Sequence, residues 1–310
     1  MEGTNAQSQT PQASLTSEQR HPDSHPVGVS IRRMRPEDAE TCGQIGFAAH
    51  GAVSVAHNVP SEQPTLEFAV GIIESLLADP LADGFVAERD GRVAGSVFLA
   101  ALTSAAAIGP LTVHPESRGG VGRRLMETAL AEARSRGIEQ VRLVQSPAHL
   151  RSLALYISVG FDVREPLVLM GGALPKPEAG STQVRPATEA DVAACNALCS
   201  RVHGLEREQE LRRAIGQGVA TVAERRGGIV GYSAGLGFLG YSVADTTDDL
   251  KALIAAASTI LGPGFFVPVR NDSLLRWLLA AGMRAVWTAN LMSVGPYQEP
   301  AGAFLPSIAF

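Results

Sequence analysis

A glycine-rich loop in the N-terminal half of the chain carries the residues best suited to chemistry. It reads Ser117-Arg-Gly-Gly-Val-Gly122 and follows the apolar run 106–113 after the dipeptide His114-Pro115. Glycines let a backbone approach an anion closely, and the amides that open a helix point outward as hydrogen-bond donors. Three basic side chains accompany these glycines: Arg118, Arg123 and Arg124. The loop is therefore suited to hold a phosphate group.

Two common phosphate-binding loops do not fit this spacing. A nucleoside-triphosphate loop ends in Gly-Lys-Ser/Thr, whereas Gly122 is followed by Arg123-Arg124. A dinucleotide loop would have a third glycine where Leu125 stands, and it would normally follow the first strand of its domain. The spacing thus disfavours both ATP and a nicotinamide cofactor.

The loop lies between an expected strand and an expected helix. The continuous apolar run 106–113 predicts a buried central strand. From Gly120 onward apolar residues recur at helical spacing, and Gly137 stands where a helix C-cap belongs. A further strand is expected over 140–145 and a second amphipathic helix over 150–159.

The chain also contains an internal repeat. Three pairs of segments match in order: 31–39 with 184–192, 85–95 with 221–231, and 149–161 with 271–283. The second pair predicts a β-hairpin with a tight glycine-containing turn in each copy. We therefore expect two copies of one α/β unit.

The loop and its neighbours resemble the acyl-CoA-binding segment of the GNAT superfamily of N-acetyltransferases. The family pattern is Gln/Arg-x-x-Gly-x-Gly/Ala after a Val-x-Pro strand end, and here Ser117 stands at its first position. Three neighbouring segments also match the family: Leu111-Thr-Val-His-Pro115, Arg123-Arg-Leu-Met126 and Leu155-Tyr-x-x-x-Gly-Phe161. The resemblance implies an α/β (α+β) fold with two tandem units, each a mixed, mostly antiparallel central sheet flanked by helices.

The resemblance covers residues 30 to 170 well and the second half partly. In the second half the segment equivalent to the loop is Asp245-Thr-Thr-Asp-Asp249, whose three carboxylates would repel a pyrophosphate. We read that copy as degenerate, with a packing or substrate-shaping role. The expected organisation is a disordered N-terminal tail over 1–27, a catalytic GNAT domain over 28–172, a linker over 173–182, a degenerate GNAT-like domain over 183–296 and a C-terminal tail over 297–310.

By resemblance, the backbone of the strand ending at Val113 binds the pantetheine arm of acetyl-CoA, and an amide near Leu111 stabilises the oxyanion. The amides from Gly119 to Arg123 bind the pyrophosphate, and the hydroxyl of Tyr156 protonates the leaving thiolate as general acid. The expected cofactor-binding residues are Leu111, Thr112, Val113, Arg118, Gly119, Gly120, Val121, Gly122, Arg123 and His149. No metal is expected.

The general base stays open at this stage. Many family members place an acid where this chain has Ile108-Gly-Pro110, which carries no carboxylate. The candidates elsewhere are Glu88, His50, His57 and His114, or water relaying a proton to one of them. The acceptor pocket is expected to be lined by the segment 53–68.

Composition sets the remaining expectations. A net charge of −5 gives no overall attraction to nucleic acid or to an anionic membrane. Cys42, Cys195 and Cys199 form an odd set without metal-ligand spacing, so buried thiols are expected. We expect a cytoplasmic N-acetyltransferase acting on a small-molecule or peptide amine, with a homodimer as one option. The alternatives are a CoA-binding regulatory protein without turnover and a GNAT-fold enzyme that uses a longer or different acyl-CoA.

Overall fold

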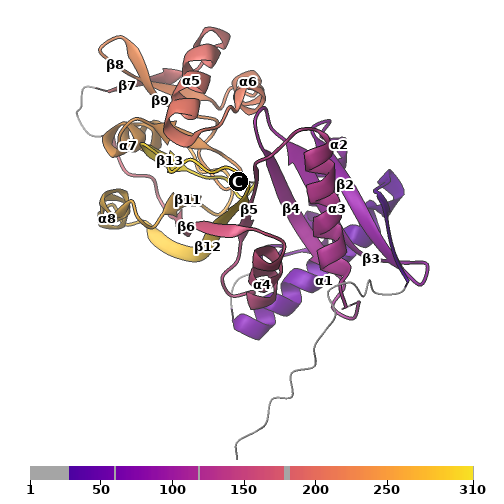
Figure 1. Ribbon diagram of the computed structural model, residues 1–310. Helices are drawn as coiled ribbons and strands as arrows, with labels where there is room; N and C mark the ends of the chain where they lie inside the picture. Colours follow the sequence, from indigo (N-terminus) through magenta and orange to yellow (C-terminus); the bar gives the residue numbers. More distant parts are fainter. Residues whose placement is uncertain (1–27, 59–60, 118, 178–181, 310) are drawn as a thin grey trace, which may run out of the picture.

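The computed structural model describes residues 28–58, 61–117, 119–177 and 182–309. The tail expected over 1–27 lies outside the described residues, as do Arg118 and the segment 178–181 of the expected linker. The described chain forms two largely antiparallel β-sheets flanked by helices (Figure 1). The expected α/β class is confirmed.

The first half of the chain contains six strands and four α-helices in its described residues. In chain order they are β1 (Val29–Arg33), α1 (Ala39–His57), α2 (Leu66–Ala78), β2 (Ala82–Arg89), β3 (Arg92–Ala101), β4 (Ala106–Val113), α3 (Val121–Ser135), β5 (Val141–Gln145), α4 (Leu150–Ser158) and β6 (Asp162–Gly171). A short 3₁₀ helix, η1 (Pro36–Asp38), leads into α1. The strands and helices expected around the glycine-rich loop are all present.

The second half repeats this order, mostly with shorter strands, and ends with one further strand. Its elements are β7 (Gln183–Pro186), η2 (Glu189–Asp191), α5 (Val192–His203), α6 (Glu208–Gly216), β8 (Thr221–Arg225), β9 (Gly228–Ser233), β10 (Ser242–Ala244), α7 (Thr247–Ala256), β11 (Phe265–Pro268), α8 (Asp272–Ala280), β12 (Arg284–Val294) and β13 (Ala303–Leu305). The segment expected as a C-terminal tail therefore includes a strand, and the side chains of Phe304 and Leu305 are buried.

Local sequence explains how the repeated hairpins and helices begin and end. Asp90 and Gly91 both have positive φ at the β2–β3 turn, and Arg226 does the same at the β8–β9 turn, as tight hairpins require. Helix α3 buries its apolar stripe, and the chain leaves it at Gly137 with a φ of 73°.

The second half contributes strands to the sheet of the first half. The larger sheet has the order β1-β2-β3-β4-β5-β12-β6-β11, so two strands of the second half complete the first sheet. Strand β12 lies between β5 and β6 and pairs antiparallel with both, while β11 pairs with β6. The smaller sheet has the order β13-β10-β9-β8-β7. The first half therefore completes its sheet with strands of the second half, whereas the smaller sheet consists of second-half strands alone.

The halves also share a hydrophobic core. One cluster of buried residues joins Leu167 and Leu169 of β6 to Leu198 of α5 and Phe266 of β11. Cys195 and Cys199 belong to this cluster, and all three cysteines are buried free thiols, as expected. None of the helices in the described residues is long and apolar enough to cross a bilayer.

A second feature of the repeat is a partly buried ion-pair triad in each half, with a buried aspartate at its centre. Arg32 binds Asp38 at 2.7 Å and Glu88 at 2.7 Å. In the second half Arg185 binds Asp191 at 2.7 Å and Glu224 at 2.6 Å. In each copy the triad fastens the short helix after the first strand to the hairpin. The matching segments thus share tertiary contacts as well as sequence.

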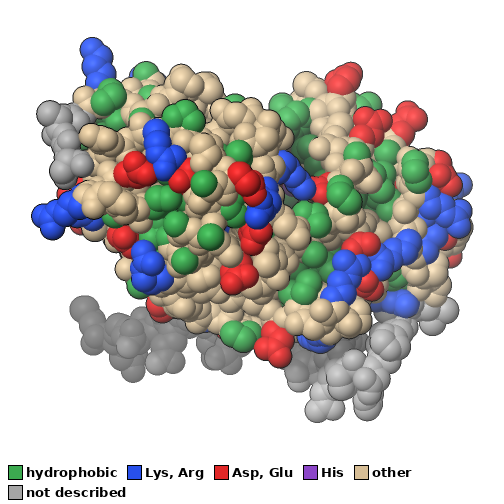
Figure 2. All heavy atoms as spheres, turned by 90° about the horizontal axis from the view of Figure 1, so that it is seen from above, with side chains coloured by type: hydrophobic (Ala, Val, Ile, Leu, Met, Phe, Trp, Pro, Cys, Tyr) green, Lys and Arg blue, Asp and Glu red, His purple; other side chains and the backbone are tan. Residues whose placement is uncertain are grey.

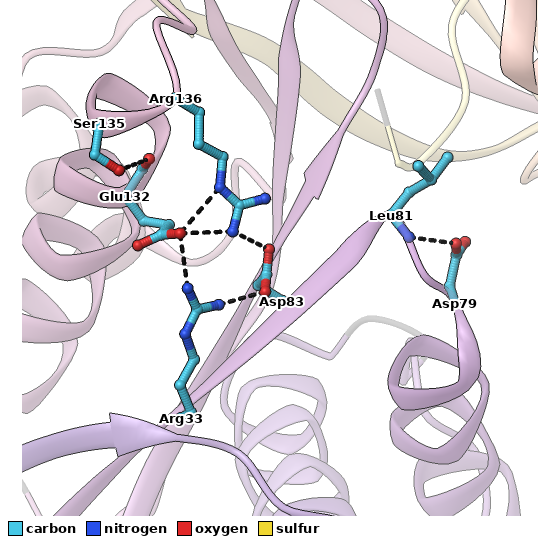
Figure 3. A network of polar contacts seen from close by, with 7 residues as sticks. All are labelled: Arg33, Asp79, Leu81, Asp83, Glu132, Ser135 and Arg136. Atoms are coloured by element: carbon cyan, nitrogen blue, oxygen red, sulfur yellow. Dashed lines mark hydrogen bonds and ion pairs between the residues drawn. The ribbon is translucent and has the colours of Figure 1, made fainter.

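A surface network holds the far end of α3 against the sheet (Figure 3). The carboxylate of Glu132 accepts from Arg33 at 2.7 Å and from the Arg136 side chain at 2.6 Å. Asp83 of β2 pairs with the same two arginines. This network fixes the helix whose opposite end receives the glycine-rich loop.

Candidate active site

The glycine-rich loop joins β4 to α3 and leaves the start of the helix open. Gly119 and Gly120 have φ values of 97° and 87°, a conformation that residues with a side chain rarely adopt. Gly120 is the N-cap of α3 and supplies no side-chain cap. The start of α3 therefore has no side-chain cap, and its first amides could bind an anion.

The basic residues around the loop have separate tasks. Arg123 donates to the hydroxyl of Ser158 on α4 at 2.6 Å, and Arg124 donates to the backbone carbonyl of Val29. Arg89 of β2, which no sequence motif indicates, donates to the carbonyl of Gly119 at 3.0 Å. Arg89 and Arg124 therefore brace the loop and its helix against the first two strands.

The next feature is the divergence of β4 from β5. The two parallel strands pair only at Ala106 with Val141 and at Ala107 with Arg142. Beyond that point β4 stays paired with β3 as far as Val113, opposite Gly95. The edge of β4 from Ile108 to Val113 therefore has no strand partner on its β5 side in the described residues.

The three predicted arm-binding residues lie on this open stretch. Thr112 is buried, and its Oγ1 lies 3.1 Å from the Ser96 Oγ. Leu111 and Val113 are half-buried and pack on the core beneath the loop. An extended ligand arm could pair with this edge by its main-chain groups alone.

Tyr156 lies on α4 below the same opening. Its ring packs 6.1 Å from that of Phe161, and its hydroxyl has no hydrogen-bond partner among the described residues. Burial raises the pKa of Tyr156, and the nearby carboxyl of Glu62 raises it further. The hydroxyl therefore stays protonated at neutral pH and is available as a proton donor.

His149 is the N-cap of α4, the position at which the sequence predicts contact with the coenzyme. Its backbone carbonyl accepts from the hydroxyl of Ser152 at 2.8 Å, and its side chain does not cap the helix. Burial lowers the pKa of His149, and the proximity of His57 and Arg151 lowers it further. The imidazole is thus held in its neutral form.

The candidate bases are separated by the fold. Glu88 is tied to Arg32, and the Nδ1 of His114 accepts from the Glu116 amide at 3.3 Å within the loop. His50 instead faces Glu62, with 3.6 Å between its Nδ1 and the Oε2 of the carboxyl. Glu62 is absent from the sequence candidates, although it lies in the segment expected to line the acceptor pocket.

In the second half, the helix start that corresponds to the start of α3 is capped by the chain's own side chains. Helix α7 starts directly after β10, and the hydroxyl of Thr246 accepts from the amide of Asp249 at 3.2 Å. The buried carboxylate of Asp249 accepts from Thr182 at 2.9 Å and Arg225 at 3.0 Å. The helix start is therefore already occupied by the chain's own capping groups.

No metal centre is built by the described residues, since none of their His, Cys, Asp and Glu side chains form a group of three or more that could hold an ion. The surface carries no large region of one charge on the face shown in Figure 2, where basic and acidic side chains are interspersed. The glycine-rich loop is therefore a candidate for a local anion site.

The comparisons with known proteins agree with this geometry. Residues 54–161 match the model of the acetyltransferase (GNAT) family. This part of the chain is a GNAT domain. A mycothiol acetyltransferase from Thermobispora bispora is 34% identical over 144 residues, which are 44% of this chain. The matched region spans 47% of that relative's length.

Solved structures extend the likeness to both halves. A candidate acetyltransferase from Pyrococcus horikoshii superposes with a TM-score of 0.65 at 18% identity, over 92% of this chain and 95% of its own. A tandem GNAT protein from the clavulanic acid biosynthesis pathway superposes with a TM-score of 0.51 at 16% identity, over 87% of this chain and 100% of its own. The tandem GNAT fold expected from the sequence is confirmed.

Proposed function

We propose that the N-terminal half transfers an acetyl group from acetyl-CoA to the amine of a small molecule or peptide. The observation that carries the proposal is the open edge of β4 beside the uncapped start of α3. A main-chain edge and a cluster of helix amides, side by side, suit a ligand with an extended amide-bearing arm and a diphosphate. Acetyl-CoA would supply the reactive thioester.

The chain's own groups then have defined tasks. The amides from Gly119 to Arg123 bind the diphosphate, and the backbone of Leu111 to Val113 binds the arm. An amide near Leu111 stabilises the negative charge that develops on the carbonyl oxygen. Tyr156, whose hydroxyl is protonated and lacks a partner in the described structure, gives its proton to the departing sulfur. His149 contacts the coenzyme at the start of α4.

The same proposal assigns the halves different roles. Residues 28–172 hold the catalytic site, and residues 183–296 pack against them and shape the acceptor side. The start of α7 supports this division, because the Thr246 hydroxyl caps the Asp249 amide and two carboxylates, Asp248 and Asp249, stand in the first turn, where they would repel a diphosphate. We also propose a cytoplasmic location, with a homodimer as one form of assembly.

Release of free thiol from acetyl-CoA with a panel of primary amines tests the function. The account expects thiol release that depends on the amine, together with an acetylated product by mass spectrometry. CoA binding without release for any amine would instead favour a regulatory protein. Mass spectrometry of CoA that copurifies with the protein would reveal a preference for a longer acyl group.

A further inference from the structure

The loop between α1 and α2 places a carboxyl group beside α1, the helix that packs against β4. The Oε2 of Glu62 lies 3.6 Å from the Nδ1 of His50, and the two side chains are 30% and 22% exposed. Glu62 is also close enough to Tyr156 for its charge to act on the phenol. The carboxyl therefore lies between α1 and α4, on the acceptor side of the proposed thioester site.

The loop is anchored so that this orientation is built into the fold. The side chain of Gln63 is 3% exposed and rests directly on Gly46 of α1, where an added Cβ would come 2.6 Å from its Oε1. The hydroxyl of Ser61 donates to the Gln63 carbonyl at 3.0 Å. Since His50 lies one helical turn beyond Gly46, fixing Gln63 directs its neighbour Glu62 towards His50.

The surroundings of Glu62, His50 and Tyr156 set the protonation states of these three side chains. Burial raises the pKa of Glu62 to about 7. Burial lowers the pKa of His50 to about 4, and the proximity of His149 adds to that shift. The groups that face Glu62 are thus a neutral imidazole on α1 and a protonated phenol on α4. Near neutral pH the carboxyl itself is the group that gains and loses a proton.

We propose that Glu62 is the general base that deprotonates the acceptor amine, with His50 as its positioning residue. The assignment rests on the proposed function. The carboxylate takes one proton from the acceptor ammonium, and the freed nitrogen forms a C–N bond to the thioester carbonyl carbon. The C–S bond breaks, and the sulfur takes its proton from Tyr156. The second proton of the nitrogen restores the phenol, and Glu62 passes its proton to water.

The inference also indicates the acceptor's charge. A carboxylate at the acceptor side attracts an ammonium before it deprotonates it, because opposite charges favour each other at short range. Glu62 thus serves both binding and proton removal. An acceptor that carries its own carboxylate beside the amine would be disfavoured at this position.

The test compares Glu62→Gln with Glu74→Gln, a matched loss of a carboxyl from an exposed position on α2. The probes are acetyl-CoA with 2-phenylethylamine, glucosamine and tri-alanine, followed by thiol release from pH 5.5 to 9. Glu62→Gln should lower kcat/KM by roughly a hundredfold or more, leave the Kd for CoA unchanged, and remove the limb that rises towards pH 7. Glu74→Gln should keep the wild-type profile.

A spectroscopic measurement tests the carboxyl without turnover. In protein labelled with carbon-13 at the glutamate carboxyls, the signal missing from Glu62→Gln should titrate with a midpoint near 7 rather than near the ordinary value of about 4.3. An ordinary midpoint would overturn the assignment.

The possible failures are distinguishable. Equal rates and equal pH profiles for wild type and Glu62→Gln would refute Glu62 as the base and leave the acetyltransferase function standing. No thiol release by the wild type with any of the three amines would instead count against the proposed function, and the assignment that rests on it would fall too.

Discussion

Val113 and Ala244 occupy the same position in the two halves of the chain. Val113 pairs across the sheet with Gly95, and Ala244 pairs with Gly231, the residue that matches Gly95 in the repeated hairpin. Their other edges differ. On the far side of Ala244 lies Ala303 of β13, whereas Val113 has no strand partner there in the described chain.

In the second half, β13 pairs with the edge of β10. In the first half, we propose that the pantetheine arm pairs with the corresponding edge of β4. Strand β13 pairs with Ser242 to Ala244, which correspond to Leu111 to Val113, and it also contacts β11 across the gap. Loss of the glycine-rich loop and filling of the strand gap occur in the same copy. Together they agree with the proposal that the first half holds a coenzyme site and that the second half has a packing role.

We predict that β13 is a structural part of the second half. Replacing Phe304, which is 1% exposed, by alanine should lower the free energy of unfolding by about 3–5 kcal/mol, because it removes a buried aromatic ring. Chemical denaturation measures this, and Leu239→Ala, at a side chain that is 70% exposed, is the control. A Phe304→Ala protein of wild-type stability that binds a second CoA would show that the strand is only a removable plug.

Tyr156→Phe should lower turnover more than affinity. The substitution removes only the proposed proton donor and keeps the packing of the ring against Phe161. We expect kcat to fall by roughly a hundredfold, with little change in the Kd for CoA. Tyr297→Phe, a change of the same kind at a ring that packs against the Arg164 guanidinium, is the control. Thiol release at equal rates for wild type and Tyr156→Phe would remove Tyr156 from the mechanism.

The Arg32–Asp38 pair should make stability depend on acid. Hydrogen bonds from Arg32 lower the pKa of Asp38 against the opposing effect of burial. A carboxyl with a lowered native pKa contributes stability above its unfolded value of about 3.9 and loses it as the pH falls through the native value.

Asp38→Asn should therefore cost about 1–3 kcal/mol at pH 7, and the difference from wild type should shrink below pH 4. Thermal unfolding from pH 2 to pH 7 measures this. Asp248→Asn removes a carboxyl that is 88% exposed and should have little effect. A penalty for Asp38→Asn that is the same at pH 2 and pH 7 would contradict the assignment.

The sequence predicts the bounds of the helices and strands better than it predicts which strands pair with each other. Turn residues, glycine caps and apolar spacing are local signals, and they placed β4 and α3 within one residue of their observed bounds. The insertion of β12 between β5 and β6 has no such signal, because an apolar strand does not specify its neighbours. The strand β13 is only three residues long and lies within the segment 297–310, for which the sequence predicts a tail.

In the candidate site, too, local features were predictable from the sequence and tertiary contacts were not. The glycines of the loop were recognisable because their conformational role depends on residue type. Glu62 was not, because its raised pKa and its contact with His50 arise from the packing of the loop on α1. Arg89 was missed for a similar reason, since its bond to Gly119 joins residues 30 positions apart.

The most direct test of the central claim is a calorimetric titration of CoA into wild type, Gly120→Ala and Gly120→Glu. Both variants share the strain of a side chain at a positive φ, but only glutamate adds bulk and negative charge where the diphosphate should bind. The account predicts one CoA per chain for the wild type, weakened binding for Gly120→Ala and no measurable binding for Gly120→Glu. Unchanged affinity in Gly120→Glu, or two sites per wild-type chain, would contradict it.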